Sequence, residues 1–255
     1  MVEILSKEEI KRIAKVMNLK AWQAERHYIQ ATMLTLLSDY PLVFKGGTYL
    51  WFFHNLNRFS EDLDFTAIGK LTNIVEKVSE GLELFGIENT CEIIKNTKYS
   101  LSFRVKAFGP LTTSEKDMVF IYCEISKREN ILNEPLTLKL DFPQYNLPIK
   151  IIKGMELNEV GSEKIRAIIT RRKARDVFDL CYLIKRKNIL FEKSMVDKKL
   201  SYYKLKFSTE LLENALDTIA PYYTKELKPF VFGGVPEFDE CKKEIMKWVK
   251  GFGKS

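Results

Sequence analysis

Residues 44–65 read FKGGTYLWFFHNLNRFSEDLDF. The opening residues, Phe44-Lys45-Gly46-Gly47-Thr48, end an apolar run that begins at Pro41 and is predicted to be a strand. The next residues, 49–53, have the dense large apolar side chains of a buried helix. Glycines at a helix start let the backbone approach an anion, and Thr48 can cap the helix and offer its hydroxyl. The stretch therefore predicts a phosphate cradle.

The second half of this stretch supplies acidic residues. Asp62 and Asp64 are two apart in a predicted strand, so both carboxylates leave one face while Leu63 and Phe65 point into the core. Paired carboxylates can hold divalent ions that bridge nucleotide phosphates and neutralise a leaving pyrophosphate. The pattern is typical of a metal-dependent nucleotidyl-transfer site.

Each motif alone has an ordinary explanation. A Gly-Gly-Thr segment is commonly a turn with a helix cap, and an Asp-x-Asp segment is commonly a solvated strand edge. Thirteen residues separate Thr48 from Asp62, which leaves room for a short helix and a return turn. That length would bring the glycines beside the acidic strand, so the two motifs support each other.

The string resembles the AbiEii-type nucleotidyltransferases, a toxin-like branch of the DNA polymerase β superfamily. The resemblance covers about residues 10–190 in four blocks that occur in the family's order. The other three blocks are Ala24–Tyr28 with a helical run to Leu37, Ile121–Glu129 with a third carboxylate and a Ser-x-Arg-Glu turn, and Glu163–Asp179 with Glu-Lys-x-x-Ala and Arg-Asp-x-x-Asp.

The resemblance implies that Asp62, Asp64 and Glu124 bind Mg²⁺ or Mn²⁺ and are catalytic. The third acid is a glutamate here, where aspartate is common in the family, and its implied role is that of metal ligand or base. Asp141 follows an alternating stretch and is the rival candidate for this role. We favour Glu124 because the Ser-x-Arg-Glu sequence follows it.

The resemblance also implies a catalytic, phosphate-binding Lys164. The other implied nucleotide-binding residues are Lys45, Gly46, Gly47, Thr48, Arg58, Ser60, Arg171, Arg175, Asp176 and Asp179. On one helix, Lys164, Arg171 and Arg175 would project as a single cationic stripe suited to a triphosphate. The alternative is a salt-bridged helix in which Lys164 pairs with Glu163 or Asp179 and Arg175 pairs with Asp179.

The expected elements indicate an α+β fold with flanking helices, and the resemblance implies that its mixed sheet is polymerase β-like. Residues 1–155 are expected to form the catalytic domain with N-terminal helices, and residues 156–255 a mainly helical domain with the basic helix. Expected elements include a capping box at Ser6-Lys7-Glu8-Glu9, a helix over 75–85, antiparallel strands over 100–108 and 118–126, and helices over 209–219 and 237–252.

Composition restricts the partners. The chain of 255 residues has a formal net charge of +7 and a pI near 9.0, with basic residues spread through its second half, which suggests an anionic partner. The resemblance implies transfer of a nucleoside monophosphate from an NTP to an acceptor hydroxyl, an RNA such as tRNA being favoured, and a cognate antitoxin. A nucleotide-binding module that acts on a protein partner, by AMPylation-like transfer or without turnover, stays open.

Other classes of protein are disfavoured. The four cysteines form no Cys-x-x-Cys pair, and the two histidines leave little scope for a histidine-based metal site or triad. His27 is expected on a polar face, and His54 with Asn55 at a helix end. The charged start of the sequence and the lack of a long apolar run predict a cytoplasmic protein without a membrane span.

Overall fold

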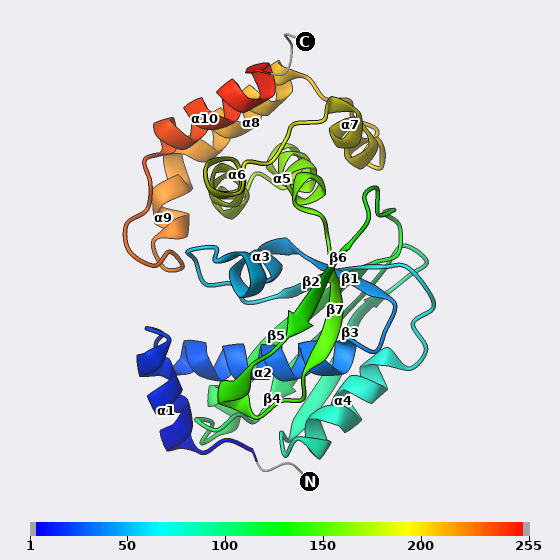
Figure 1. Ribbon diagram of the computed structural model, residues 1–255, viewed down its shortest axis with the longest axis vertical. Coiled ribbons are helices and arrows are strands. Elements are labelled where there is room, and N and C mark those ends of the chain that lie inside the picture. The colour runs from blue at the N-terminus through cyan, green and yellow to red at the C-terminus, as the bar shows by residue number, and fades with distance from the viewer. Residues whose placement is uncertain (1–3, 252–255) are drawn as a thin grey trace. The chain divides into compact units, whose positions relative to one another are not determined.

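The computed structural model describes residues 4–251, which fold into two compact units (Figure 1). The first unit contains the chain up to Tyr49 together with Glu61–Asn130 and Pro135–Gly154. The second contains Leu50–Ser60, Ile131–Glu134 and the chain from Met155 onward. The expected division into residues 1–155 and 156–255 stays a prediction.

The first unit is built on a seven-stranded mixed sheet with the strand order β3-β4-β5-β2-β1-β7-β6. The strands are β1 (Leu42–Lys45), β2 (Leu63–Ala67), β3 (Asn89–Asn96), β4 (Ser100–Ala107), β5 (Val119–Ser126), β6 (Leu136–Leu140) and β7 (Lys150–Gly154). Strand β2 runs antiparallel to β1 and parallel to β5, so the acidic strand lies inside the sheet. The mixed sheet with helices confirms the predicted α+β class.

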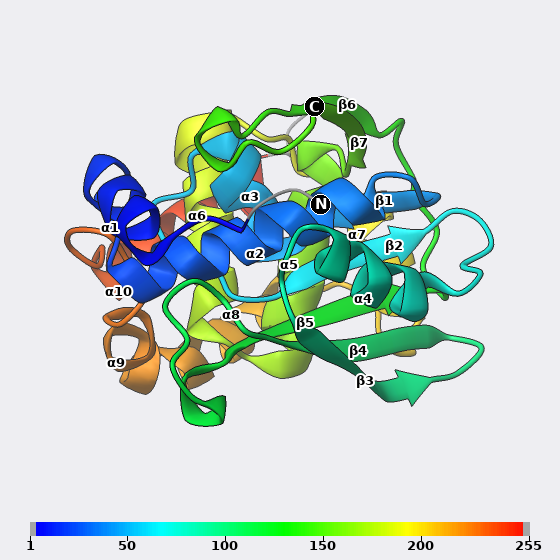
Figure 2. The ribbon, with the colours of Figure 1, turned by 90° about the horizontal axis from the view of Figure 1, so that it is seen from below.

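Three helices of the first unit flank this sheet. They are α1 (Lys7–Val16), which packs on α2 (Ala21–Leu37), and α4 (Ile74–Leu84). Figure 2 shows α2 and α4 side by side over one face of the sheet. The predicted capping box opens α1, since the backbone N–H of Ser6 donates to Glu9 Oε2 over 2.8 Å. The buried positions of α2 form much of the core.

His27 corrects one expectation from the sequence. It was predicted on a polar face of its helix, yet it is only 4% exposed within α2. Its Nδ1 shares a hydrogen bond of 2.8 Å with the hydroxyl of Tyr145, and burial lowers the pKa of His27 to about 3. An uncharged imidazole with a hydroxyl partner is therefore accommodated in the core.

Alternation along β4 and β5 defines the two faces of the sheet. Leu101, Phe103 and Val105 of β4 are buried, and the intervening residues are half-buried. On β5, Ile121 is fully buried, whereas Tyr122 is 44% exposed. The two strands pair antiparallel from Ser100↔Ser126 to Ala107↔Val119, as predicted. One face therefore packs on the helices, and the other presents polar and aromatic side chains.

The second unit is mainly helical. Its helices are α5 (Leu157–Arg171), α6 (Ala174–Lys187), α7 (Lys193–Ser201), α8 (Thr209–Ile219), α9 (Tyr223–Leu227) and α10 (Phe238–Gly251). The predicted helices over 209–219 and 237–252 are found, although Phe252 lies outside the described residues. Between residues 4 and 251, no helix combines the length and apolarity needed to cross a membrane.

Candidate active site

The glycines lie beside the acidic strand. Helix α3 (Gly46–His54) begins directly after β1, and the antiparallel register pairs Lys45 with Asp64. Gly46 has a φ of +81°, and a Cβ atom built there would lie 2.2 Å from Asp64 Oδ2. Only glycine fits this position, because a side chain would both strain the backbone and displace the carboxylate. The predicted proximity of the two motifs is thus present in the fold.

Thr48 has a different task from the one expected. Helix α3 starts at Gly46, so Thr48 lies inside its first turn and does not precede it as a cap. The hydroxyl is fully buried and donates to the backbone carbonyl of Asp62. This bond ties the start of α3 to the segment that carries the two aspartates. The groups at the helix start that suit an anion are therefore the backbone amides.

The acidic side chains share one face of the sheet. Asp64 and Glu124 are register partners on the parallel strands β2 and β5, so their side chains project to the same side. Asp62 precedes Asp64 by two residues, just before β2 begins. Asp141 follows the edge strand β6, which β1 and β7 separate from β2, and it pairs with Lys139. The register thus brings Glu124, and not Asp141, to the acidic strand.

These carboxylates fit a hard divalent cation. No three His, Cys, Asp or Glu side chains among residues 4–251 are already grouped as a metal site. Mg²⁺ is commonly bound through one or two carboxylates together with water and substrate phosphates. Asp64 and Glu124 offer such a pair of oxygen donors, next to the glycine start of α3. The residues present therefore suit Mg²⁺ or Mn²⁺ bound together with a phosphorylated ligand.

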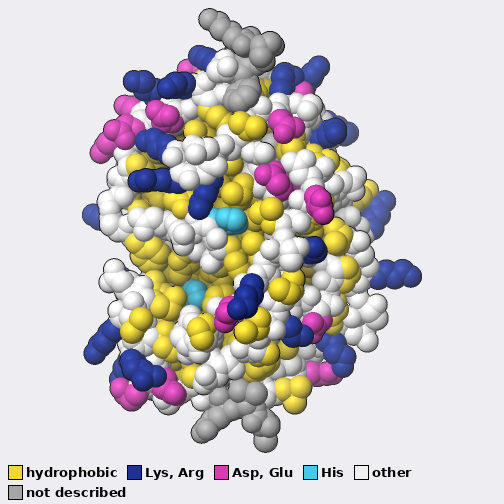
Figure 3. Space-filling model, viewed as in Figure 1, with side chains coloured by type: hydrophobic (Ala, Val, Ile, Leu, Met, Phe, Trp, Pro, Cys, Tyr) yellow, Lys and Arg dark blue, Asp and Glu magenta, His cyan; other side chains and the backbone are white. Residues whose placement is uncertain are grey.

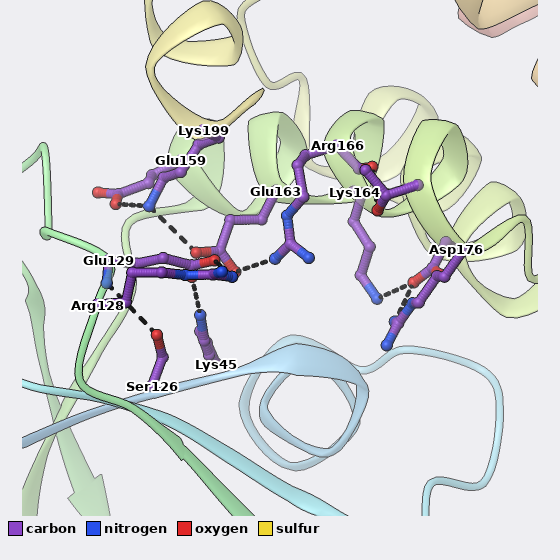
Figure 4. Close-up of polar contacts among 12 residues, drawn as sticks. Lys45, Ser126, Arg128, Glu129, Glu159, Glu163, Lys164, Arg166, Asp176 and Lys199 are labelled. Atoms are coloured by element: carbon purple, nitrogen blue, oxygen red, sulfur yellow. Dashed lines mark hydrogen bonds and ion pairs between the residues drawn. The ribbon is translucent and has the colours of Figure 1, made fainter. Parts of the chain in front are cut away.

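Lys45 has a buried partner that was not singled out from the sequence. Its Nζ lies 2.9 Å from Glu129 Oε2, and both side chains are less than a tenth exposed (Figure 4). Glu129 ends the predicted Ser-x-Arg-Glu turn, in which its N–H donates to Ser126 Oγ. A lysine buried in the core needs a counter-charge. The position of Lys45 in an apolar strand could therefore have indicated an acidic partner such as Glu129. The turn therefore positions the partner of Lys45.

The second unit contains a buried cluster of charges. Arg58 grips Asp179 bidentately, with Nε donating to Oδ1 over 2.6 Å and Nη2 donating to Oδ2 over 2.7 Å. The third nitrogen of the guanidinium donates to the carbonyl of Phe59. Arg58 is 2% exposed and Asp179 is fully buried. Ser60, at the end of this segment, is also buried. Arg58 thus fixes its own loop against helix α6.

Two more cations complete this cluster. Lys164 Nζ lies 2.9 Å from Asp176 Oδ1 (Figure 4). It also lies 2.6 Å from Asp179 Oδ2, and Arg171 binds Asp176 bidentately over 2.7 Å. Burial by itself raises the pKa of Asp176, but Lys164 and Arg171 outweigh it and hold that pKa below its ordinary value. Arg58 and Lys164 likewise outweigh burial and lower the pKa of Asp179. Three cations face two carboxylates, which leaves a net positive charge.

The predicted stripe on a single helix is wrong. Helix α5 ends at Arg171, Arg172 takes a left-handed conformation with a φ of 53°, and α6 begins at Ala174. Arg175 therefore belongs to the next helix, where its guanidinium lies 5.6 Å from the ring centroid of Phe230. Lys164 and Arg171 still converge, because both reach Asp176 across the turn.

The salt-bridge alternative is correct in one respect. Lys164 does pair with Asp179, as that alternative proposed, and also with Asp176. Glu163, its other proposed partner, binds Lys199 instead, over 3.1 Å. Lys199 also contacts Glu159 over 2.6 Å. The charged residues of α5 thus divide into two separate groups.

Solved structures of other proteins share this architecture. No curated protein sequence matches the chain. The solved structure of JHP933 from Helicobacter pylori is similar at a TM-score of 0.65 and 21% identity, over 91% of this chain and 92% of that one. The structure of MenT4, a nucleotidyltransferase toxin from Mycobacterium tuberculosis H37Rv, is similar at a TM-score of 0.69 and 18% identity, over 98% of this chain and 90% of that one.

At these identities the solved structures show a shared fold. Membership of a family follows from the sequence. Residues 29–244 match the family model for the nucleotidyl transferase AbiEii toxin of type IV toxin–antitoxin systems. The match includes the glycines, the aspartates, Glu124 and the buried charge cluster. The chain belongs to the AbiEii family of nucleotidyl transferase toxins.

Proposed function

We propose that this enzyme transfers a nucleoside monophosphate from an NTP to a hydroxyl of RNA, with tRNA as the acceptor and Mg²⁺ as the cofactor. The observation that carries the proposal is the contact between Gly46 and Asp64, with Glu124 in register beside them. The start of α3, which can bind an anion, therefore lies next to carboxylates that can bind a metal ion.

Each residue then has a role in the reaction. Asp62, Asp64 and Glu124 would hold Mg²⁺, which would neutralise charge on the phosphates and on the leaving pyrophosphate. The backbone amides of Gly46 and Gly47 bind phosphate oxygens. The acceptor oxygen attacks the α-phosphorus, the bond to the bridging oxygen of pyrophosphate breaks, and Glu124 takes the acceptor's proton. Nucleoside monophosphate ends on the acceptor, and pyrophosphate leaves.

The cations of the second unit supply phosphate binding. Lys164, Arg58 and Arg171 carry more positive charge than Asp176 and Asp179 neutralise. The two aspartates hold these cations in fixed positions, and a fixed cation costs less entropy when it binds phosphate. Arg171 is the most exposed of the three, with 58% of its side chain accessible, and is the group we propose to contact phosphate first.

RNA is the proposed acceptor because of charge. The chain has a net charge of +7, which favours an anionic macromolecule as acceptor. Family membership adds a cognate antitoxin as the expected protein partner.

The test is transfer of α-labelled ATP, CTP, GTP and UTP to total tRNA with Mg²⁺. The native chain should label RNA with at least one NTP, and Asp62→Ala plus Asp64→Ala should abolish labelling. The control replaces two exposed acids, Asp39 and Asp217, by alanine and should keep activity. Absence of RNA labelling by the native chain with every NTP rejects the RNA acceptor, and labelling of a protein instead would identify the second acceptor class.

The third acid has its own test. Glu124→Gln should lower the turnover number by at least a hundredfold, because it removes both a metal ligand and a base. Asp141→Asn should leave turnover unchanged, since Asp141 follows the far edge strand of the sheet. The reverse result would transfer the role to Asp141.

Growth inhibition separates catalysis from binding. If the toxin acts by turnover, expression of the native chain should stop growth, and the variant with alanine at Asp62 and Asp64 should not. A variant that has lost transfer and still inhibits growth would show that harm comes from binding a partner.

A further inference from the structure

The face of the sheet that does not pack on α2 and α4 carries an aromatic and cationic surface beside the acidic residues. Strand β5 presents Phe120 and Tyr122 there, and strand β4 presents Arg104 and Lys106. These positions alternate with fully or nearly fully buried residues, so their side chains point away from the face that packs on the helices. Tyr122 is 44% exposed and the side chain of Lys106 is 35% exposed. We call these four residues the aromatic ladder.

The ladder is ordered by its own contacts. The guanidinium carbon of Arg104 lies 5.8 Å from the ring centroid of Phe120 and 5.7 Å from that of Tyr122. Arg104 Nη1 also donates to the hydroxyl of Tyr122 over 3.1 Å. Glu92 on β3 accepts from Arg104 and lies 3.6 Å from Lys106. Two rings and two cations are thus held on one face, and Glu92 pairs with both cations.

The ladder is continuous with the acidic face. Tyr122 precedes Glu124 by two residues on β5. At the start of the neighbouring parallel strand, Asp62 likewise precedes Asp64 by two residues. Two residues along a strand span about 7 Å. An acceptor whose terminal hydroxyl lies at Asp64 and Glu124 would therefore place its neighbouring nucleotides over Tyr122 and Arg104.

We propose that the aromatic ladder binds the unpaired nucleotides next to the acceptor hydroxyl of the RNA. This inference rests on the proposed function and names the residues that select its substrate. Exposed rings flanked by arginine and lysine are the chemistry of single-strand binding, in which bases stack on rings and cations bind the backbone phosphates. The ladder selects an RNA end that is single-stranded, because bases inside a duplex are already stacked on both faces.

The same contacts could serve only to stabilise a solvent-facing sheet, since cross-strand pairs of this kind do so. A stabilising role affects folding, whereas a binding role affects the KM for RNA and leaves the KM for NTP unchanged. Steady-state transfer to two RNA hairpins separates them: one hairpin ends in four unpaired 3′ nucleotides, and the other is blunt.

For the native chain, the hairpin with the overhang should have the lower KM. Tyr122→Leu should raise that KM about tenfold with no change in the KM for NTP, and Tyr122→Phe should keep the native value because the ring remains. The matched control is Tyr40→Leu, a partly exposed tyrosine of the same unit that lies near Lys77 of α4. It should leave both KM values unchanged.

Glu92→Gln gives a result that a purely structural role does not predict. Removal of the Glu92 carboxylate, which pairs with Arg104 and Lys106, should lower the KM for the overhang hairpin about threefold. If the native chain labels RNA but Tyr122→Leu and Glu92→Gln leave the KM values unchanged, the aromatic ladder does not bind the RNA. The proposed function would not be affected by that result. A native chain that labels no RNA would reject the proposed function itself. Binding of a fluorescent single-stranded oligoribonucleotide to the same variants checks the result without turnover.

Discussion

At the scale of single residues, one glycine connects the two motifs of the candidate site. Gly46 starts α3 with a left-handed φ, and its Cα lies against the carboxylate of Asp64. The sequence predicted that the glycines and aspartates meet, because the intervening length allows a short helix and a return. It did not show that the contact involves Gly46 and Asp64, since this depends on the register between β1 and β2.

Gly46→Ala should reduce nucleotidyl transfer by about a hundredfold, because the new methyl group displaces the Asp64 carboxylate from its position. The matched control is Gly233→Ala, which also has a positive φ of 88° but has open space where the Cβ would lie. Gly233→Ala should cost about 1 kcal/mol of stability and keep the native turnover number. Equal turnover in the two variants, measured by labelled NTP transfer, would show that the contact is unimportant.

A second prediction at this scale concerns pH. Burial lowers the pKa of His27 to about 3, so the folded protein does not protonate this residue between pH 6.5 and 3, whereas the unfolded chain does. The stabilisation is complete above pH 6.5 and is lost as the pH falls through this window, by about 1.4 kcal/mol per pH unit. Urea unfolding at pH 7 and pH 5 should therefore show a loss of about 2 kcal/mol from His27.

His27→Gln should remove this part of the pH dependence, because glutamine does not titrate and can still bond to the Tyr145 hydroxyl. His54 also has a lowered pKa, of about 4, through burial and the nearby Lys187, and it stays in both proteins, so its contribution cancels. A pH dependence that is the same in both proteins would mean that His27 is protonated in the folded state.

At the scale of elements, the sequence predicted those with a strong local pattern. Alternation located β4 and β5, apolar periodicity located α4 and α8, and a capping box located the start of α1. Strand β3 was not predicted, since its residues from Thr90 onward are mostly exposed and it lies at a sheet edge. Amphipathic alternation is weak where neither face is fully buried.

The interrupted basic helix shows why the candidate site was only partly predictable. Residues 163–179 read as one helical segment, because no glycine or proline interrupts them. The chain nevertheless turns at Arg172, in a conformation that arginine rarely adopts. The turn is decided by tertiary contacts: the carbonyl of Arg172 accepts a hydrogen bond from Tyr222, fifty residues away. The partners of Lys164 follow from this turn and could not be read from spacing alone.

Arg172→Gly should stabilise the protein by about 1 kcal/mol, because glycine adopts the left-handed conformation without the strain that a Cβ introduces. The side chain of Arg172 is exposed, and Arg172→Ala is the matched control, since it removes the side chain and keeps the strain. Thermal unfolding should show a higher Tm for the glycine variant than for the alanine variant. A Tm for Arg172→Gly at or below that of Arg172→Ala would contradict the strain at this turn.

At the scale of the whole molecule, charge is distributed over the surface. The chain carries 41 lysines and arginines and 34 aspartates and glutamates, and on the face shown in Figure 3 basic and acidic side chains are interspersed. Net charge alone therefore attracts RNA without choosing where it binds. The place of binding must come from local groups in which cations and rings occur together, as in the aromatic ladder.

Salt dependence measures how many phosphates the protein contacts. Each contact to single-stranded RNA adds about 0.7 to the slope of log Kd against log salt, so three contacts should raise the Kd more than tenfold between 50 and 200 mM salt. Lys106→Gln should reduce this slope by about 0.7, because one contact is lost. Lys77→Gln removes the same charge from the exposed surface of α4, which covers the other face of the sheet, and should leave the slope unchanged. If the two variants have equal slopes, the RNA binds elsewhere on the surface. If the Kd of the native chain does not depend on salt, the protein recognises the acceptor without contacting its phosphates.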